Sequence, residues 1–102
     1  MYYIVSLKHT HRVDKYITLW RPDNCGYCYA QDQAGKYSEI EDGYHNVEYD
    51  SLPIEVSVLD GFFINSEISS KNVVKKCIPN CKQVWDVLNL KMTKQGLVIR
   101  KK

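Results

Sequence analysis

The hydrophobic positions at the start of the chain follow the period of a β-strand. In residues 2–7, the side chains of Tyr3, Val5 and Leu7 fall on one face, and the segment is rich in aromatic and β-branched residues. Residues 15–21 repeat the same period of two. Both segments are therefore predicted to be strands, each with one face turned towards a core.

Turn residues and further alternation extend this prediction to a sheet. Residues 22–26 combine proline, aspartate, asparagine and glycine, which favour a tight turn, and residues 27–29 return as a third strand. Such short connections predict an antiparallel three-stranded N-terminal meander. After a long polar loop at residues 31–50, one or two further strands are expected, at residues 53–59 and at the short apolar run 62–64, and residues 97–99 are expected to form a final short strand.

One helix is predicted near the C-terminus. Asn80 and Gln83 have the spacing of a capping box, with Asn80 as the N-cap residue. Val84, Trp85 and Leu88 then fall on one face at helical spacing, and the helix is expected to end near residue 90. Residues 65–72, just before this region, are expected to form a flexible loop.

These elements predict an α+β fold in a single domain, residues 1–102. Its expected parts are a small antiparallel sheet, with a three-stranded N-terminal meander plus one or two further strands, and one C-terminal helix. No apolar run approaches the roughly 18 residues that a membrane-spanning helix needs, and the N-terminus has no basic leader. The protein is therefore expected in the cytoplasm, which would be the host cytosol for a phage protein.

Charge and aromatic content indicate the kind of partner. The net charge is only +2, which argues against a general binder of nucleic acid. Aromatic and basic side chains nevertheless gather in residues 8–29, and these side chains stack on bases and neutralise phosphate. The same aromatic residues could instead pack a core with their polar tips in water. The predicted ligand-binding residues are Lys8, His9, Lys15, Trp20, Arg21, Asn24, Tyr27, Tyr29 and Asn46.

The residue types divide this set by role. Trp20, Tyr27 and Tyr29 are predicted to stack on a ligand. The anion contacts are predicted to be Lys8, His9, Lys15 and Arg21, while Asn24 and Asn46 would contact polar edges.

The cysteines offer a metal site as an alternative. Cys25 and Cys28 have the spacing of a zinc knuckle, and Cys77 and Cys81 could supply a second pair. The second pair has the looser spacing, and Cys81 falls on the apolar face of the predicted helix. We therefore expect no metal and no cofactor. The chain has no complete catalytic motif, so a binding protein is predicted rather than an enzyme.

Several short motifs carry a resemblance to a known group. The strings Lys8-His9-Thr10, Trp20-Arg21-Pro22-Asp23-Asn24 and Gly26-Tyr27-Cys28 resemble a family of small, uncharacterised bacteriophage-encoded proteins. The resemblance implies an accessory factor that acts on the host, for which sequestering a nucleotide signal of host immunity is one mode. The first prediction is therefore a protein that binds a small phosphorylated or nucleotide-like ligand.

Two alternatives stay open. One is a protein–protein inhibitor or adaptor that acts on a host defence protein through the same aromatic and arginine side chains. The other is a zinc-supported nucleic-acid binder. Salt dependence separates them, because affinity for nucleic acid falls steeply with salt and an aromatic-anchored protein interface is less sensitive.

Overall fold

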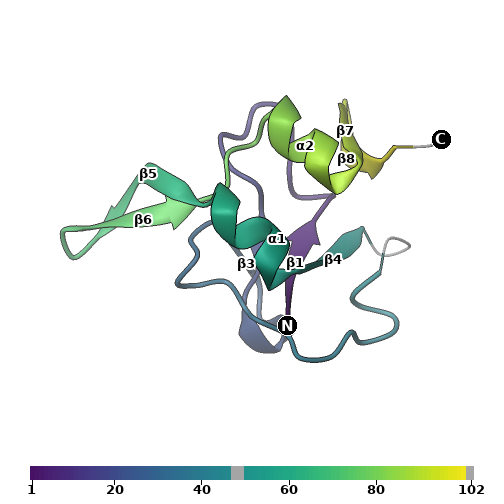
Figure 1. Ribbon diagram of the computed structural model, residues 1–102, viewed down its shortest axis with the longest axis horizontal. Helices are drawn as coiled ribbons and strands as arrows, with labels where there is room; N and C mark the ends of the chain where they lie inside the picture. Colours follow the sequence, from purple (N-terminus) through teal and green to yellow (C-terminus); the bar gives the residue numbers. More distant parts are fainter. Residues whose placement is uncertain (47–49, 101–102) are drawn as a thin grey trace.

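The computed structural model describes residues 1–46 and 50–100, which form an α+β fold of antiparallel sheets and two short α-helices (Figure 1). The largest sheet has the order β3-β2-β1-β4. Its strands are β1 (Tyr2–Ser6), β2 (Leu19–Trp20), β3 (Tyr27–Cys28) and β4 (Ser51–Glu55). All three pairings are antiparallel. β1 lies between two neighbours, and its residues from Tyr3 to Ser6 are buried on both faces.

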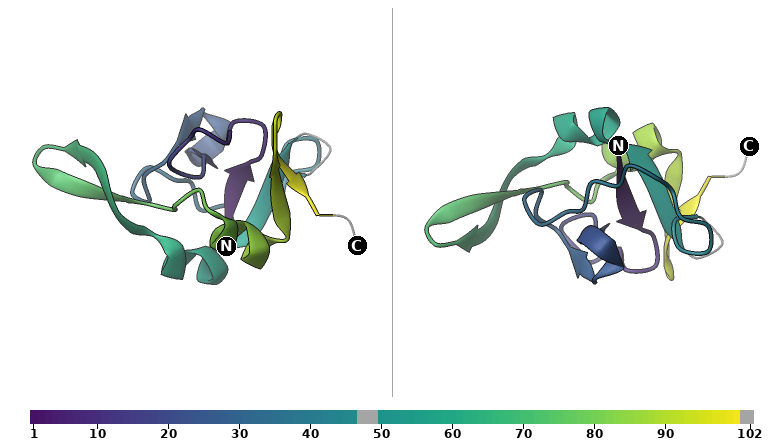
Figure 2. Two further views of the ribbon diagram at one scale, coloured as in Figure 1. Left: turned by 90° about the horizontal axis from the view of Figure 1, so that it is seen from above. Right: turned by 90° about the horizontal axis from the view of Figure 1, so that it is seen from below.

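A two-stranded arm projects from the body of the molecule. It consists of β5 (Ile64–Ser70) and β6 (Val73–Cys77), which pair antiparallel across a two-residue turn. Lys71 and Asn72 in this turn have φ values of 52° and 65°, the conformation that the tightest hairpin turns require. Figure 2 shows the arm extending away from the larger sheet in both views.

The remaining elements share one hydrophobic core with the larger sheet. They are α1 (Val56–Leu59), α2 (Lys82–Leu88) and the hairpin of β7 (Leu90–Thr93) and β8 (Gly96–Ile99). The core combines apolar side chains from all these parts: Tyr3, Val5, Leu7, Ile17, Leu19, Leu59, Ile78, Val84, Leu88, Leu90 and Leu97. No helix among the described residues is long and apolar enough to cross a membrane.

The expectation of a single helix is wrong, because residues 56–59 form α1 instead of extending a strand. β4 pairs with β1 only as far as Glu55, which lies opposite Tyr2 at the start of β1. Beyond that point the chain has almost no strand left to pair with, and it turns into a helix. The helical turn buries Leu59 completely and leaves Val58 42% exposed.

The predicted second and third strands are also shorter than expected. Only Leu19 and Trp20 belong to β2, because residues nearer the start of the segment pair elsewhere. The backbone N–H of Ile17 donates to the carbonyl of Ile78 over 2.9 Å, and Tyr16 forms a bridge with Pro79. The segment from residue 15 to 17 is thus tied to the chain before α2.

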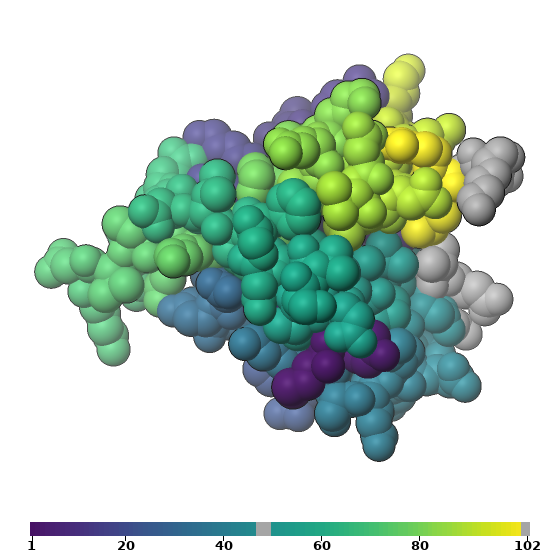
Figure 3. Space-filling model, viewed as in Figure 1, coloured from purple at the N-terminus to yellow at the C-terminus, as the bar shows by residue number. Residues whose placement is uncertain are grey.

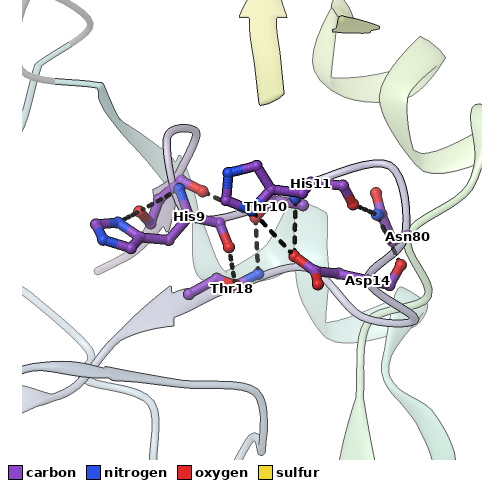
Figure 4. A network of polar contacts seen from close by, with 7 residues as sticks. His9, Thr10, His11, Asp14, Thr18 and Asn80 are labelled. Carbon is purple, nitrogen blue, oxygen red and sulfur yellow. Dashed lines mark hydrogen bonds and ion pairs between the residues drawn. The ribbon is translucent and has the colours of Figure 1, made fainter. Parts of the chain in front are cut away.

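Asn80 is not the N-cap residue of α2. That position is held by Cys81, which makes no side-chain cap hydrogen bond. The amide of Asn80 is used at longer range: Nδ2 donates to the carbonyls of His11 (2.8 Å) and Asp14 (2.9 Å), and Oδ1 accepts from Trp85 Nε1 (2.8 Å). Figure 4 shows the contacts to His11 and Asp14. Asn80 therefore joins the loop after β1 to the helix.

Two further expectations about loops have different outcomes. Residues 65–72 are not a loop, because they form most of β5 and the turn of the arm. Within the long segment at 31–50, residues 47–49 lie outside the described part of the chain. The described remainder is mostly turns and bends, with a bridge between Tyr37 and Tyr2.

Candidate ligand-binding site

A hollow with apolar and basic walls lies beside β3. It measures about 440 Å³, within the range of pockets that hold small molecules. Four of the nine predicted ligand-binding residues line it, namely His9, Arg21, Tyr27 and Tyr29. We call it the Arg21 pocket. Its lining consists of His9, Thr18, Arg21, Tyr27, Cys28, Tyr29, Ala30, Gln33 and, from β5 of the arm, Ile68.

Two tyrosines reach this pocket from the end of β3. Tyr27 belongs to β3 and Tyr29 lies at the bend just after it, and both side chains line the pocket. Cys28 between them is only 7% exposed and belongs to the core. The Tyr29 ring approaches the Tyr16 ring with centroids 6.1 Å apart at 58°, so the two rings are not stacked in parallel.

His9 is held in place by hydrogen bonds within the loop after β1 (Figure 4). Its Nδ1 lies 3.0 Å from Ser6 Oγ, and its carbonyl accepts from Thr18 Oγ1 over 2.8 Å. The fully buried Thr10 braces the same loop, because its hydroxyl donates to the Ser6 carbonyl and accepts from the Thr18 backbone N–H. The His9 ring then stacks on Tyr27, with centroids 4.2 Å apart and planes inclined by 30°.

Arg21 brings the positive charge to the pocket. Its Nε donates to the carbonyl of Tyr27 over 2.9 Å, which fixes the start of the guanidinium group. No carboxylate among the described residues forms an ion pair with Arg21, and its terminal nitrogens make no hydrogen bond there. The Gln33 amide, also at the pocket, likewise has no hydrogen-bond partner within residues 1–46 and 50–100. Both groups remain available to a ligand.

Trp20 and Asn24 lie outside the Arg21 pocket. Together with Gly26 and Tyr27 they line a separate hollow of about 190 Å³. The Trp20 ring meets the ring of Tyr27 at 90° (6.0 Å) and that of His45 at 80° (5.4 Å). Its Nε1 is buried and has no hydrogen-bond partner among the described residues. Trp20 is thus a packed side chain and offers less open surface than a stacking role predicts.

His45 packs against Trp20 and hydrogen-bonds to its neighbours. It was not among the residues that the sequence analysis predicted for the site. The side chain is 2% exposed, its Nδ1 accepts from the Glu41 backbone N–H (3.0 Å), and its Nε2 lies 2.8 Å from Asn24 Oδ1. Since Nδ1 accepts, the proton of the neutral ring resides on Nε2 and is donated to Asn24. Burial lowers the pKa of His45, although nearby Glu41 opposes this change.

Tyr37 and Asn24 complete this closed group, which we call the His45 cluster (Trp20, Asn24, Tyr37, Glu41 and His45). The Tyr37 hydroxyl donates to the Arg21 carbonyl and accepts from the Asn24 backbone N–H over 3.0 Å. Asn24 Nδ2 donates to Glu41 Oε2 over 3.1 Å. Asn24 also has a φ of 57°, which asparagine tolerates better than most residues. The side-chain amide of Asn24, which was predicted to contact a ligand, therefore makes its hydrogen bonds within the protein.

The three other predicted residues are not brought to the Arg21 pocket. Lys15 is at the surface, where its ammonium pairs with Glu67 of β5. Lys8 is exposed and does not line the pocket. Asn46 is half-buried, and its Oδ1 has no hydrogen-bond partner in the described part of the chain. Gln33 and Ile68 do line the pocket, but no sequence pattern links either residue to positions 9–29.

The four cysteines are free thiols with different surroundings. Cys25 is exposed, Cys28 and Cys77 are buried, and Cys81 is half-buried. Burial raises the pKa of Cys28 to about 11, so its thiol is protonated near neutral pH and is a poor nucleophile and metal ligand. Within residues 1–46 and 50–100, no three Cys, His, Asp or Glu side chains form a group that could hold a metal ion.

Comparisons with known proteins identify no relative of this chain. No protein-family model, curated protein or solved structure matches the chain. The likeness to bacteriophage proteins remains a prediction from the motifs of the sequence. Inference about function therefore rests on the Arg21 pocket and its surroundings.

Proposed function

We propose that this protein binds a small phosphorylated or nucleotide-like ligand in the Arg21 pocket. The observation that carries the proposal is the meeting of an Arg21 guanidinium, which has no carboxylate partner among the described residues, with the aromatic side chains of Tyr27 and Tyr29. These three residues lie in and beside the hairpin of β2 and β3, and all of them line a single hollow of about 440 Å³.

The chemistry of the lining favours an anion joined to a planar ring. A guanidinium is planar and forms two parallel hydrogen bonds with a phosphate, which makes it a strong and directional anion contact. Aromatic faces stack on bases of any sequence, and each such contact contributes about 1–3 kcal/mol. Because Arg21 Nε is held by the Tyr27 carbonyl, the cation and the ring are positioned together before a ligand arrives.

The biological role that we propose is sequestration. The resemblance of the sequence motifs to small bacteriophage proteins makes a nucleotide signal of host immunity the ligand to test first. Tight binding alone removes such a signal, and this role requires no catalytic group.

Titration calorimetry with linear and cyclic nucleotides tests the proposal. At least one nucleotide should bind the wild-type protein, and Arg21→Gln should weaken that binding at least about tenfold, since a charged hydrogen bond is worth about 1.5–3 kcal/mol. The control is Lys94→Gln, which removes an exposed charge in the turn between β7 and β8. The absence of binding across the panel, or equal affinities of wild-type and Arg21→Gln protein, would refute the proposal.

A second function, the inhibition or bridging of a host protein, is favoured by the arm. β5 and β6 carry three large apolar side chains that are about half exposed: Ile64 (50%), Val73 (58%) and Val74 (52%). In the space-filling view the outer end of the arm projects beyond the body (Figure 3). If this function is correct, Val73→Thr combined with Val74→Thr should abolish capture of a host protein, whereas Arg21→Gln should leave that capture intact.

A further inference from the structure

The Arg21 pocket contains one fixed positive charge. Among the described residues that line it, Arg21 is the only lysine or arginine, and none is an aspartate or glutamate. Lys15 adds no net charge nearby, because it is paired with Glu67. Lys8 is exposed and lies outside the lining. The pocket therefore supplies enough charge to bind one anionic group.

The pocket also offers one well-placed ring surface to a ligand. His9 already stacks on Tyr27 at 4.2 Å, so part of the Tyr27 ring is covered by the protein itself. Tyr29 has only the inclined contact with Tyr16 at 58°, and no ring among the described residues stacks on it in parallel. Tyr29 is thus the open platform for one planar group.

Gln33 supplies a polar contact at the same place. Its amide carries both donors and an acceptor, and no hydrogen-bond partner for it exists among the described residues. Asn24, which could have contacted polar edges, uses both ends of its amide on Glu41 and His45. Gln33 is therefore the amide that can contact the edge of a bound ring.

Building on the proposed function, we infer that the Arg21 pocket selects a ligand with one planar ring and one phosphate group, the chemistry of a nucleoside monophosphate. Phosphates beyond the first meet no further lysine or arginine among the described residues of the lining. Affinity should depend strongly on the presence of the first phosphate and hardly at all on the second and third.

Calorimetry with adenosine, ribose 5-phosphate, AMP, ADP and ATP tests this inference, in buffer with a chelator to remove divalent ions. The series is repeated with the other three bases, and the base that binds most tightly is used for comparison. The monophosphate should bind at least about tenfold more tightly than the nucleoside or the sugar phosphate, as expected for one charged hydrogen-bonded pair or one stacking contact. The diphosphate and triphosphate should bind within about twofold of the monophosphate.

Two outcomes overturn different claims. If a diphosphate or triphosphate binds more than about tenfold tighter than its monophosphate, the single-phosphate inference is wrong while the proposed function stands. If no nucleotide of any base binds, the proposed function fails and the inference fails with it.

Variants separate the phosphate contact from the rest of the site. Arg21→Gln should lower affinity for the monophosphate to that of the nucleoside and leave nucleoside affinity unchanged. Lys8→Gln and Lys15→Gln should each leave monophosphate affinity within about twofold of wild type, and a loss as large as that of Arg21→Gln would contradict the single-cation pocket. Should Arg21→Gln fail to fold, Arg21→Lys provides the comparison, because it keeps the charge and loses the planar fork.

Discussion

The Arg21 pocket and the His45 cluster are built from similar side chains but differ in how their polar atoms are used. Each places a histidine against aromatic rings, His9 against Tyr27 and His45 against Trp20 and Tyr37. His45 is 2% exposed and both its ring nitrogens contact protein atoms, whereas His9 is exposed. In the pocket, the Arg21 terminal nitrogens and the Gln33 amide have no partner among the described residues.

This difference shows why residue type alone does not identify a site. An aromatic and polar group whose hydrogen bonds are made within the chain stabilises the fold, because unpaired buried groups would be costly. The same residue types with unused donors at an open hollow can recognise a ligand. Separate effects on stability and on binding are therefore the way to test the comparison.

The largest expected effect on stability is that of removing the Trp20 ring. Trp20→Ala should lower the free energy of unfolding by about 3 kcal/mol, because the ring packs against Tyr27 and His45 and its loss leaves a cavity. Tyr29→Ala, at the open pocket, should cost less than about 1 kcal/mol, within the range of more exposed positions. Urea denaturation of both variants measures the two values.

A conservative change at the same position sharpens this test. Trp20→Phe should cost much less than Trp20→Ala, because the buried Nε1 that it removes has no hydrogen-bond partner among the described residues. If Trp20→Ala and Tyr29→Ala lower the free energy of unfolding equally, the side chains of the His45 cluster are no more important for stability than those of the Arg21 pocket.

The next effect concerns the loop that positions His9. Asn80→Ala removes the bonds to the carbonyls of His11 and Asp14 and the bond from Trp85, and should cost about 2 kcal/mol on denaturant unfolding. Asn65→Ala is the matched control, because this exposed asparagine of β5 makes no side-chain hydrogen bond with the described residues. A cost at position 80 no greater than that at position 65 would show that the loop is not held by this amide.

The core-facing side chains of β1 were predictable from the alternation of a strand, although Ile4 and Ser6 on its other face are buried as well. Tyr3, Val5 and Leu7 do face the core, as their period of two predicts. The hydrogen bonds of Asn80 were not predictable, because its partners lie up to 69 positions away in the sequence. Local capping rules describe only near neighbours. The prediction of a strand over residues 53–59 was wrong at its end for a similar reason, because β4 can extend only as far as the start of β1, its distant partner.

The candidate site was predictable only in part. His9, Arg21, Tyr27 and Tyr29 line the pocket, and they were found because aromatic and basic residue types gather in one segment. Gln33 and Ile68 could not be found in this way, because the fold of the loop and of the arm brings them in. Trp20 and Asn24 have the residue types of a site, and their contacts place them in the His45 cluster.

The smallest expected effect is a pH dependence of stability that comes from His45. Burial lowers its pKa in the folded protein below the ordinary value of 6.5. As the pH falls below 6.5, the unfolded chain takes up a proton at this histidine while the folded protein does not, so the free energy of unfolding decreases. The contribution is fully present above pH 6.5 and is lost progressively down to the folded pKa, below which His45 adds no further slope.

Urea denaturation of wild type and of His45→Gln across this pH range isolates the contribution of His45. His45→Gln should lower stability at every pH and should lose the part of the pH dependence that begins near 6.5. His11→Gln is the matched control, since the imidazole of His11 is 52% exposed and its substitution should leave that part in place. If His45→Gln keeps the wild-type dependence of the free energy of unfolding on pH, the buried, neutral imidazole of His45 does not contribute to that dependence. His45 and the exposed His9 would then differ only in how their rings are packed.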